Sequence, residues 1–475
     1  MRQLYKHYIG GEWVDPAEFA TRDLINPATA KKSGEMVLGT AADVDKAVAA
    51  AREAFESFAF TSREERLELL NAIIAEYKKR MAEMAEVITL EMGAPKTLAE
   101  RAHAPSGLGH LMTAAKVLEN YEFHEDRGPT RIAKEPIGVV GMITPWNWPI
   151  NQITCKVAPA IATGCTMVLK PSEVAPYSAQ LFTEIMEAAG VPKGVYNLVY
   201  GEGPSVGEAM SAHPGIDMMS VTGSTRMGSA VQAASAPTIK RVTQELGGKS
   251  ANIILDDANL EEVVARETLA AMRNTGQTCT LLSRMLVPAD RMDEAASIAH
   301  QAASSVVTGD PTKEETTMGP IAHGQQFEKV GAMMQEAVDE GARLVVGGPG
   351  RPDGCPEGFF VKPTVFADVK PEMTIAREEV FGPVLAIMGY ETEDDAVRIA
   401  NDSIYGLSGA VQSADPERAR RVAAKMRTGM VYINGAPGDI SAPFGGYKQS
   451  GNGREWGDHA FADFLETKSI LGYNA

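Results

Sequence analysis

Ile137-Gly138-Val139-Val140-Gly141-Met142-Ile143 is an unbroken apolar run that stops at Thr144-Pro145. A helical pattern follows over residues 151–162, and a second short apolar stretch follows over 166–169. Buried strands that alternate with helices are typical of βαβ units, in which the strands form a parallel sheet. We therefore expect an α/β fold built on the strand that begins at Ile137.

The same alternation continues along the chain and starts again after Glu245. Before Glu245 the sequence predicts a helix over 178–189 and strands over 196–200 and 218–221. After Glu245 it predicts strands over 250–255 and 284–287 and helices over 260–272 and 292–305. This restart indicates that a second α/β domain begins near residue 249.

The N-terminal part of the chain is mainly helical in pattern. Apolar residues recur at helical spacing over 41–58 and again over 63–92. Residues 9–14 are typical of a tight hairpin, because two glycines separate short strand-like segments. Residues 131–134 and 468–471 fit neither α/β domain, and we expect them to be strands of a small appended sheet.

Composition limits the classes of function that the chain can have. With 475 residues it is too long for one compact core, so two or three domains are expected. Its formal net charge of −17 argues against nucleic acid as a partner, because phosphates are bound by clustered Lys and Arg. The start of the chain lacks the apolar segment of a secretory signal, and no apolar stretch of about 18 residues follows. We therefore expect a cytoplasmic protein without a membrane partner.

Cys279 ends the tetrapeptide Gly276-Gln277-Thr278-Cys279 and is the first candidate for covalent chemistry. A thiol attacks a carbonyl as the thiolate, and Gly276 permits close approach of the backbone around it. The alternative is a buried structural cysteine, which is the commoner role for a single cysteine. The other cysteines, at 155, 165 and 355, receive that structural interpretation, and no spacing among the four predicts a metal site.

Glu245 precedes Leu246-Gly247-Gly248-Lys249, and the paired glycines permit a sharp reversal of the chain. A carboxylate that is partly removed from water there is suited to act as a general base with a raised pKa. The alternative is a carboxylate that forms an ion pair with Lys249. The sequence alone leaves both readings open.

Thr144-Pro145-Trp146-Asn147-Trp148-Pro149 follows the first strand as a stiff loop. A fixed Asn147 amide is able to donate a hydrogen bond to an oxyanion. The alternative is a turn asparagine surrounded by packed aromatic rings.

Two further turns follow strands and are typical of nucleotide sites. Leu169-Lys170-Pro171-Ser172-Glu173 comes where open α/β sheets bind nucleotides, and its charged side chains are able to bond ribose hydroxyls. Val221-Thr222-Gly223-Ser224 opens a helix, whose N-terminus attracts phosphate. The alternatives are an ordinary charged turn and a lone glycine motif, which is weak evidence by itself.

In this order and spacing, these stretches resemble the aldehyde dehydrogenase superfamily, in its NAD(P)-dependent, hydrolytic branch with a cysteine nucleophile. The resemblance runs from about Ile9 to Lys468. The matching motifs are Pro145-Trp146-Asn147-Trp148-Pro149, Lys170-Pro171-Ser172-Glu173, Thr222-Gly223-Ser224, Glu245-Leu246-Gly247-Gly248-Lys249, Gly276-Gln277-Thr278-Cys279, Glu379-Val380-Phe381-Gly382-Pro383 and Pro443-Phe444-Gly445-Gly446-Tyr447-Lys448-Gln449-Ser450-Gly451.

The resemblance implies an α/β, aldehyde dehydrogenase-like fold with a Rossmann-type cofactor domain, an α/β catalytic domain and a small oligomerisation sheet. The implied bounds are 1–120 and 137–248 for the NAD-binding domain, 249–448 for the catalytic domain, and 121–136 and 456–475 for the oligomerisation segments. It also implies a homodimer or homotetramer, since a lone protomer would leave the appended strands as unpaired edges.

The resemblance also implies a role for each candidate residue. Cys279 attacks the aldehyde, Asn147 and the Cys279 backbone N–H hold the oxyanion, and Glu245 activates the water that hydrolyses the thioester. Lys156 is implied to relay protons or to position groups. The implied cofactor, NAD with NADP as the alternative, contacts Ile143, Thr144, Pro145, Trp146, Lys170, Ser172, Glu173, Gly203, Gly223, Ser224, Leu246, Glu379 and Phe381.

The expected substrate wall departs from the family pattern at Cys155, where relatives often have a second tryptophan. Trp148, Asn151, Gln152 and Cys155 share one face of a helix, and this face is more polar than in many relatives. We therefore hypothesise a polar aldehyde, an ω-oxo acid or a semialdehyde. The full expected wall is Trp148, Asn151, Gln152, Cys155, Thr278, Thr280, Gly438 and Phe444.

Two other functions remain as alternatives. A CoA-acylating semialdehyde dehydrogenase typically lacks the base that Glu245 provides. A non-catalytic structural protein on the same scaffold usually lacks the nucleophile or the base. A carboxylate at Glu173 would repel a 2′-phosphate, so NAD is the expected cofactor.

Overall fold

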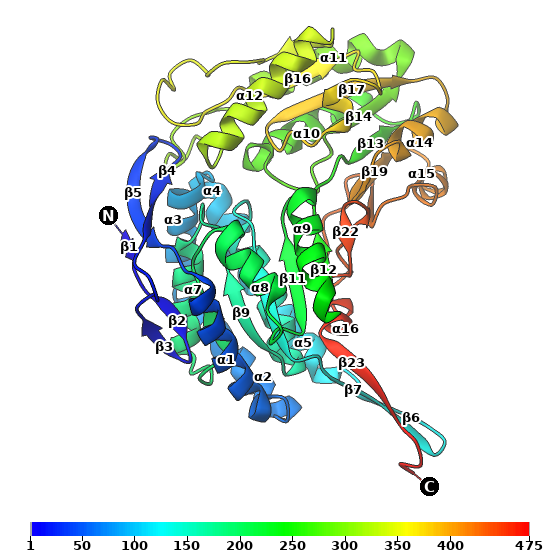
Figure 1. Ribbon diagram of the computed structural model, residues 1–475. Coiled ribbons are helices and arrows are strands. Elements are labelled where there is room, and N and C mark those ends of the chain that lie inside the picture. Colours follow the sequence, from blue (N-terminus) through cyan, green and yellow to red (C-terminus); the bar gives the residue numbers. More distant parts are fainter. Residues whose placement is uncertain (1, 475) are drawn as a thin grey trace.

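The computed structural model describes residues 2–474 and contains two large sheets, one above the other in Figure 1. Eight strands form the first sheet, in the order β22-β12-β11-β8-β9-β10-β2-β3. Its five central strands are parallel, whereas β22, β2 and β3 are antiparallel to their neighbours. The strands are β2 (His7–Ile9), β3 (Glu12–Val14), β8 (Val139–Ile143), β9 (Thr166–Lys170), β10 (Tyr196–Leu198), β11 (Met218–Thr222), β12 (Arg241–Glu245) and β22 (Gly451–Asn452).

Helices cover both faces of this sheet, which explains why its strands read as continuous apolar runs. Along β8, Val140 and Met142 join the core on one face, whereas Val139 and Ile143 join the core on the other. On the first face lie α2 (Arg63–Lys79), α3 (Met81–Met92), α5 (Ala104–Asn120), α6 (Pro149–Thr163) and α7 (Tyr177–Ala188). On the second lie α1 (Ala41–Phe58), α8 (Glu208–Ala212) and α9 (Thr225–Ser235).

The second sheet has seven strands in the order β15-β16-β17-β14-β13-β19-β20, all parallel except β15. These strands are β13 (Ala251–Ile254), β14 (Arg284–Pro288), β15 (Arg343–Val346), β16 (Thr364–Ala367), β17 (Val384–Tyr390), β19 (Ser408–Gln412) and β20 (Met430–Ile433). One face packs against α10 (Leu260–Met272) and α11 (Met292–Ser304). The other packs against α12 (Gly324–Asp339), α13 (Thr374–Arg377), α14 (Glu393–Asn401) and α15 (Pro416–Ala423).

A three-stranded antiparallel sheet extends from the body of the protein at the lower right of Figure 1. It consists of β6 (His124–Arg127), β7 (Thr130–Pro136) and β23 (Leu465–Ile470). The strands that the sequence predicted at 131–134 and 468–471 are thereby confirmed. The remaining elements are β1 (Arg2–Leu4), β4 (Thr21–Asn26), β5 (Lys31–Val37), α4 (Lys96–Leu98), β18 (Tyr405–Gly406), β21 (Tyr447–Lys448) and α16 (His459–Asp463).

One predicted helix is wrong as a continuous element. The pattern over 63–92 is two helices, because the backbone of Arg80 leaves the helical region with φ −113° and ψ 13°. Its guanidinium binds the carboxylates of Glu83 and Glu184. The predicted hairpin over 9–14 is confirmed, with positive φ at both Gly10 and Gly11.

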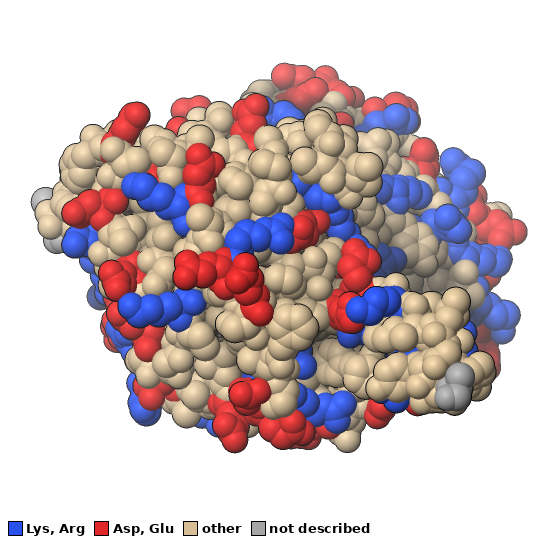
Figure 2. All heavy atoms as spheres, turned by 60° about the horizontal axis from the view of Figure 1, so that its bottom comes forward, with Lys and Arg blue, Asp and Glu red and all other residues tan. Residues whose placement is uncertain are grey.

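The surface carries charges of both signs. On the face turned forward in Figure 2, Asp and Glu side chains lie among Lys and Arg side chains. Within residues 2–474, no helix is long and apolar enough to cross a membrane.

Candidate active site

The carboxyl ends of the parallel strands in the first sheet place several predicted residues along one edge. Ile143 ends β8 beside Lys170, the last residue of β9, and Thr222 ends β11 beside Glu245, the last residue of β12. Ligands of open α/β sheets bind at this edge. The strand register therefore brings residues that are far apart in the sequence to one place.

Cys279 lies in a loop between α10 and β14 whose backbone is strained. Asn274, Thr275 and Gly276 have φ of 53°, 55° and 67°, so consecutive residues are left-handed. A Cβ on Gly276 would lie 2.0 Å from the carbonyl oxygen of Gly382, which leaves room only for glycine. Strain of this kind persists where the surroundings fix the backbone, and it is frequent at functional sites. The loop thus gives the half-buried Cys279 thiol a defined position.

The Gly247-Gly248 turn packs directly against Cys279. A Cβ on Gly248 would lie 2.5 Å from the carbonyl oxygen of Cys279, and one on Gly247 would lie 2.4 Å from Glu379 Oε2. Glu379 Oε1 accepts the Gly248 N–H at 2.9 Å. Loss of solvent around the sulfur, and then the carboxylates of Glu379 and Glu245, raise the pKa of Cys279. The protein's own groups therefore favour the neutral thiol.

The stiff loop that contains Asn147 is bonded to the same cysteine loop. The buried Asn147 side-chain amide donates to the Gln277 carbonyl oxygen at 3.0 Å. The neighbouring Trp148 indole donates to Thr278 Oγ1, also at 3.0 Å. Both bonds end within two residues of Cys279, so the amide and the thiol are held in one unit. An amide nitrogen has two hydrogens, and the second is available to an oxyanion on Cys279.

The Glu245 carboxylate is buried, and neither of its oxygens has a hydrogen-bond partner among residues 2–474. The pairing with Lys249 that the sequence left open is therefore absent. Burial, and then the nearby Glu455 carboxylate, raise the pKa of Glu245 well above its usual range. A carboxyl group with a raised pKa and no partner is suited to accept a proton from water.

Glu455 is a charged residue of this region that the sequence analysis missed. Its carboxylate forms a buried ion pair with Lys156, one of the predicted catalytic residues. It also accepts the Cys155 thiol at 3.3 Å. Glu455 belongs to the segment that follows the Pro443–Gly451 motif, and no periodicity in that segment marks it.

The two predicted nucleotide turns carry polar groups at the carboxyl ends of β9 and β11. Lys170 Nζ donates to the Pro171 carbonyl oxygen at 3.0 Å and to Glu173 Oε2 at 3.3 Å. Burial lowers the pKa of Lys170. At Glu173 burial acts to raise the pKa, but Lys170, a backbone hydrogen bond and Arg22 together lower it. At the second turn, Ser224 Oγ caps α9 by accepting the Met227 N–H at 3.2 Å. Polar groups are thus available at both turns, for a ribose at the first and for a phosphate at the second.

Buried polar atoms at the same edge fit a dinucleotide. Thr144 Oγ1 and Thr222 Oγ1, beyond the end of β8 and at the end of β11, have no hydrogen-bond partner within the described chain. Gly203 begins the turn that leads to α8, and a Cβ there would meet nothing within 4 Å. Ser172, also predicted to contact the cofactor, is buried and accepts the Val174 N–H at 3.2 Å.

Two aromatic rings pack against Trp146, one of the residues predicted to contact the cofactor. Trp146 lies edge-on to Phe381, with ring centroids 5.4 Å apart, and both were predicted. His323, which the sequence analysis missed, lies edge-on to Trp146 at 5.2 Å. It caps the start of α12, and an N-cap histidine carries no motif that would have identified it. The structure thereby adds His323 to the residues around Trp146.

Several side chains of the predicted substrate wall are buried or already in contact with other residues of the protein. Asn151 bonds His110 Nε2 at 2.9 Å, and Phe444 stacks on Trp456 with centroids 4.3 Å apart. His110 and Trp456 were not predicted. Cys155 is buried, and its thiol donates a hydrogen bond to the Glu455 carboxylate.

The remaining predicted residues occupy mixed positions. Leu246 is buried and donates its N–H to the Ser450 carbonyl oxygen at 2.9 Å. The Thr280 carbonyl accepts the Ser408 hydroxyl at 3.0 Å. Gln152 is buried, and its Oε1 is without a partner in the part of the chain that the structure describes. Pro145 is half-buried beside Trp146, and Gly438 is exposed in the loop before β21.

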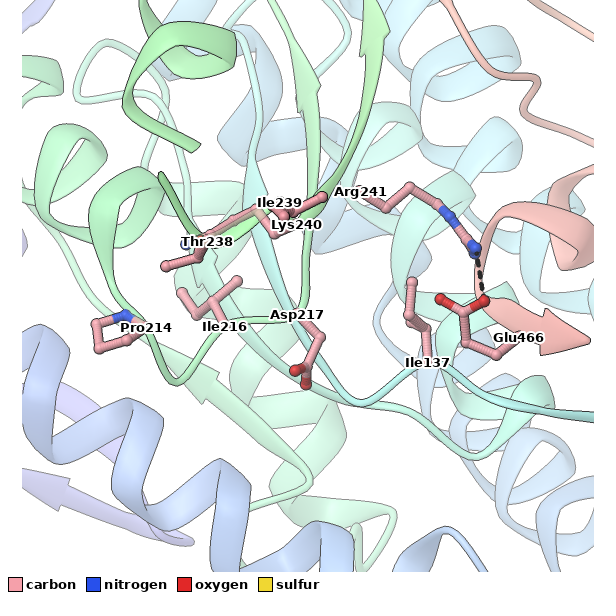
Figure 3. Close-up of a pocket in the computed structure, with 9 residues that line it drawn as sticks. All are labelled: Ile137, Pro214, Ile216, Asp217, Thr238, Ile239, Lys240, Arg241 and Glu466. Carbon is pink, nitrogen blue, oxygen red and sulfur yellow. Dashed lines mark ion pairs between the residues drawn. The ribbon is translucent and has the colours of Figure 1, made fainter. Parts of the chain in front are cut away.

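A separate hollow of about 440 Å³ opens at the amino ends of β11 and β12 (Figure 3). None of the predicted site residues lines it. Its charged side chains are already bonded: Arg241 pairs with Glu466 at 3.1 Å, and Lys240 donates to the His213 carbonyl at 2.6 Å. The hollow therefore lies at the opposite end of β12 from Glu245.

The family model described as "Aldehyde dehydrogenase family" matches residues 13–470. The chain belongs to the aldehyde dehydrogenase family. The family, the α/β fold and the class of enzyme that the sequence indicated are thereby confirmed. Within residues 2–474, no group of His, Cys, Asp and Glu side chains is arranged to hold a metal ion.

Relatives of this aldehyde dehydrogenase differ in the aldehydes that they are named for. A 3-succinoylsemialdehyde-pyridine dehydrogenase of Pseudomonas sp. is 54% identical over 474 residues, covering 100% of this chain and 99% of its own. A cysteine-to-alanine mutant of aldehyde dehydrogenase C from Pseudomonas syringae, crystallised with NAD+ and octanal, is 51% identical with a TM-score of 0.98, covering 98% and 96%. Betaine aldehyde dehydrogenase of Staphylococcus aureus with NAD+ is 39% identical with a TM-score of 0.95, covering 99% and 95%.

Proposed function

We propose that the protein oxidises an aldehyde to a carboxylic acid with NAD+, through a thioester on Cys279. The convergence of three groups carries this proposal. The Asn147 amide bonds the loop of Cys279 at Gln277. The unpaired Glu245 carboxylate ends β12, near enough to the Cys279 thiol to add, after burial and Glu379, to the rise of its pKa. A nucleophile, an oxyanion donor and a base are what hydrolytic aldehyde oxidation requires.

In the first step the Cys279 thiol gives up its proton through the Glu245 carboxylate to solvent. Its sulfur then bonds to the aldehyde carbon, and the carbonyl oxygen becomes an oxyanion. The Asn147 side-chain N–H and the Cys279 backbone N–H donate to that oxyanion. Bound NAD+ supplies the hydride acceptor, and loss of hydride from the carbon leaves a thioester on Cys279. Glu245 then takes a proton from water, which attacks the thioester carbon. The carbon–sulfur bond breaks, the acid leaves and the thiolate returns.

The residues that would hold NAD+ are those at the two nucleotide turns and around Trp146. Lys170 and Glu173 would bond the adenosine ribose, and the N-terminus of α9 at Ser224 would face the pyrophosphate. Glu379 and Phe381 would contact the nicotinamide ribose and ring. Crystals of related enzymes with NAD+ support this choice of cofactor. We expect NAD to be preferred to NADP because the Glu173 carboxylate would repel a 2′-phosphate.

We propose an aldehyde with a polar far end, such as a semialdehyde, as the substrate. Polar groups on the expected wall, including Asn151 and Gln152, support this choice, as does the relative named for a pyridine semialdehyde. The octanal complex of another relative favours an alkyl substrate instead. Succinic semialdehyde and butanal have equal chain length, so their kcat/KM values isolate the effect of the polar end. A clear preference for butanal would contradict this proposal.

The central test measures NADH absorbance over a panel of aldehydes, with wild type and Cys279→Ala. We expect wild type to form NADH and the free acid, and the variant to form neither while still binding NAD+. Coenzyme A is then added, because a CoA-acylating enzyme would release an acyl-CoA in place of the acid. Absence of NADH formation with every aldehyde would favour a non-catalytic protein on the same scaffold.

We also propose that the enzyme is a cytosolic homo-oligomer. In a single chain, β6 and β23 are the outer strands of a small sheet that extends from the body (Figure 1). Exposed strand edges of this kind tend to pair with another chain. Light scattering coupled to gel filtration measures the mass in solution, and the mass of a monomer would contradict this proposal.

A further inference from the structure

A buried histidine, His103, lies behind the oxyanion site and has no role in the steps described above. It is the last residue of a π-helical segment, Ala99–His103, immediately before α5. Its side chain is completely buried, and its ring stacks on Trp148 with centroids 3.9 Å apart. Single π-helical turns inside helices are frequent at functional sites.

His103 is bonded to Asn274, which lies in the strained loop before Cys279. His103 Nε2 and Asn274 Oδ1 are 3.1 Å apart. The Asn274 amide nitrogen donates to the Asn147 carbonyl oxygen at 3.1 Å and to the Gln277 carbonyl oxygen at 3.2 Å. The Gln277 oxygen is the one that also accepts the Asn147 side-chain amide. Asn274 therefore joins both segments of the oxyanion site.

These bonds determine where the proton of His103 lies. Carbonyl oxygens only accept, so the atom of Asn274 that faces two of them is its amide nitrogen. The Asn274 oxygen must then accept, and His103 Nε2 must carry the hydrogen. The other nitrogen, Nδ1, has no partner among residues 2–474. Burial lowers the pKa of His103 to about 3, so the ring stays neutral.

We propose that His103 and Asn274 are positioning residues that orient the Asn147 amide toward the oxyanion. The His103 N–H fixes the orientation of the Asn274 amide. Asn274 then fixes the two carbonyl groups that set the place of the Asn147 side chain. One N–H of Asn147 stays on Gln277, and the other points to the reacting oxygen. This inference rests on the proposed role of Asn147.

The test replaces His103 with a residue that has an aromatic ring but no ring N–H. His103→Phe retains stacking on Trp148, and His103→Gln places an amide N–H near the former Nε2. We expect His103→Phe to lower kcat/KM roughly 10- to 100-fold, because small displacements of catalytic groups have effects of that order. His103→Gln should restore most of the activity. Alkylation of Cys279 by iodoacetamide forms no oxyanion, so its rate should stay close to that of wild type.

A double-mutant cycle separates positioning from general damage to the fold. If His103 acts through Asn147, then His103→Phe should cost nothing further in an Asn147→Ala background. Losses that multiply, or full activity of His103→Phe, would overturn the inference and leave the proposed function intact. Full activity of Asn147→Ala would instead overturn the oxyanion assignment and this inference with it.

Two further variants complete the test: one is a substitute in case His103→Phe does not fold, and the other is a control away from the site. Asn274→Gly tolerates the φ of 53° and removes the His103 bond together with the two bonds that Asn274 donates, so it replaces His103→Phe in the cycle if that variant is insoluble. His7→Phe is the matched control, because His7 is equally buried and accepts the Tyr200 N–H at 3.2 Å, away from the site. It should lower the melting temperature without lowering kcat/KM. An equal loss of kcat/KM in His7→Phe would overturn the positioning role.

Discussion

Lys156 and Glu455 form an ion pair in the interior, where their side chains are 1% and 10% exposed. Burial alone would lower the pKa of Lys156, but Glu455, together with Cys155 and Glu245, raises it overall. The pair lies close enough to Glu245 for both members to act on its pKa, Glu455 upwards and Lys156 downwards. The charge state of the candidate base therefore depends on this pair.

Lys156→Met should destabilise the protein by about 3–5 kcal/mol, because it leaves the Glu455 carboxylate buried without its partner. The double variant Lys156→Met/Glu455→Met should recover most of that loss, since no unpaired charge remains. Urea unfolding measures both. Lys79→Met breaks an exposed pair with Glu76 and should cost less than about 1 kcal/mol. Similar losses in both lysine variants would contradict the buried pairing.

Glu245→Gln should remove the step in which water is activated and lower kcat roughly 10²- to 10⁴-fold, as expected for loss of a general base. The base acts only when ionised, and its pKa is raised. In wild type, kcat should therefore rise with pH through a pKa above the usual carboxyl range. The glutamine variant should lack that rise and should release a burst of NADH as the thioester accumulates. A pH profile unchanged in the variant would show that another group is the base.

The sequence was sufficient for elements whose signal is periodic. The strand predicted over 137–143 is β8 (Val139–Ile143), and the helix predicted over 260–272 is α10, because apolar runs, apolar spacing and helix length are local properties. The break at Arg80 was missed because the apolar pattern continues on both sides of it. The domain bounds remain a prediction.

The candidate site was predictable where a motif carries chemistry, as at Cys279 and Glu245. His103, His323 and Glu455 were missed because each acts through a contact between distant segments. His103 meets Asn274 across 171 positions of sequence, and Glu455 meets Lys156 across 299. Pairing over such separations depends on how the helices pack, which no local pattern records.

Glu173→Gln should weaken discrimination against NADP. The Glu173 carboxylate, paired with Lys170 at 3.3 Å, keeps its charge because that lysine lowers its pKa. Replacement by an amide removes the repulsion of a 2′-phosphate and leaves Lys170 free to attract it. The ratio of dissociation constants for NADP and NAD, measured by quenching of tryptophan fluorescence, should fall roughly tenfold, which corresponds to about 1.4 kcal/mol. An unchanged ratio would show that Glu173 does not select the cofactor.

Gly276→Ala should abolish most activity, whereas Gly190→Ala should not. Both glycines have positive φ, 67° and 74°, so alanine adds a similar backbone strain of about 1–2 kcal/mol at each. A Cβ at Gly190 would meet nothing within 4 Å, but one at Gly276 would lie 2.0 Å from the Gly382 carbonyl oxygen. The loop must then move, and displacement of Cys279 should lower kcat/KM about 100-fold. Melting temperature and kcat/KM measure the two effects separately, and equal kcat/KM in both variants would show that the close approach does not position the thiol.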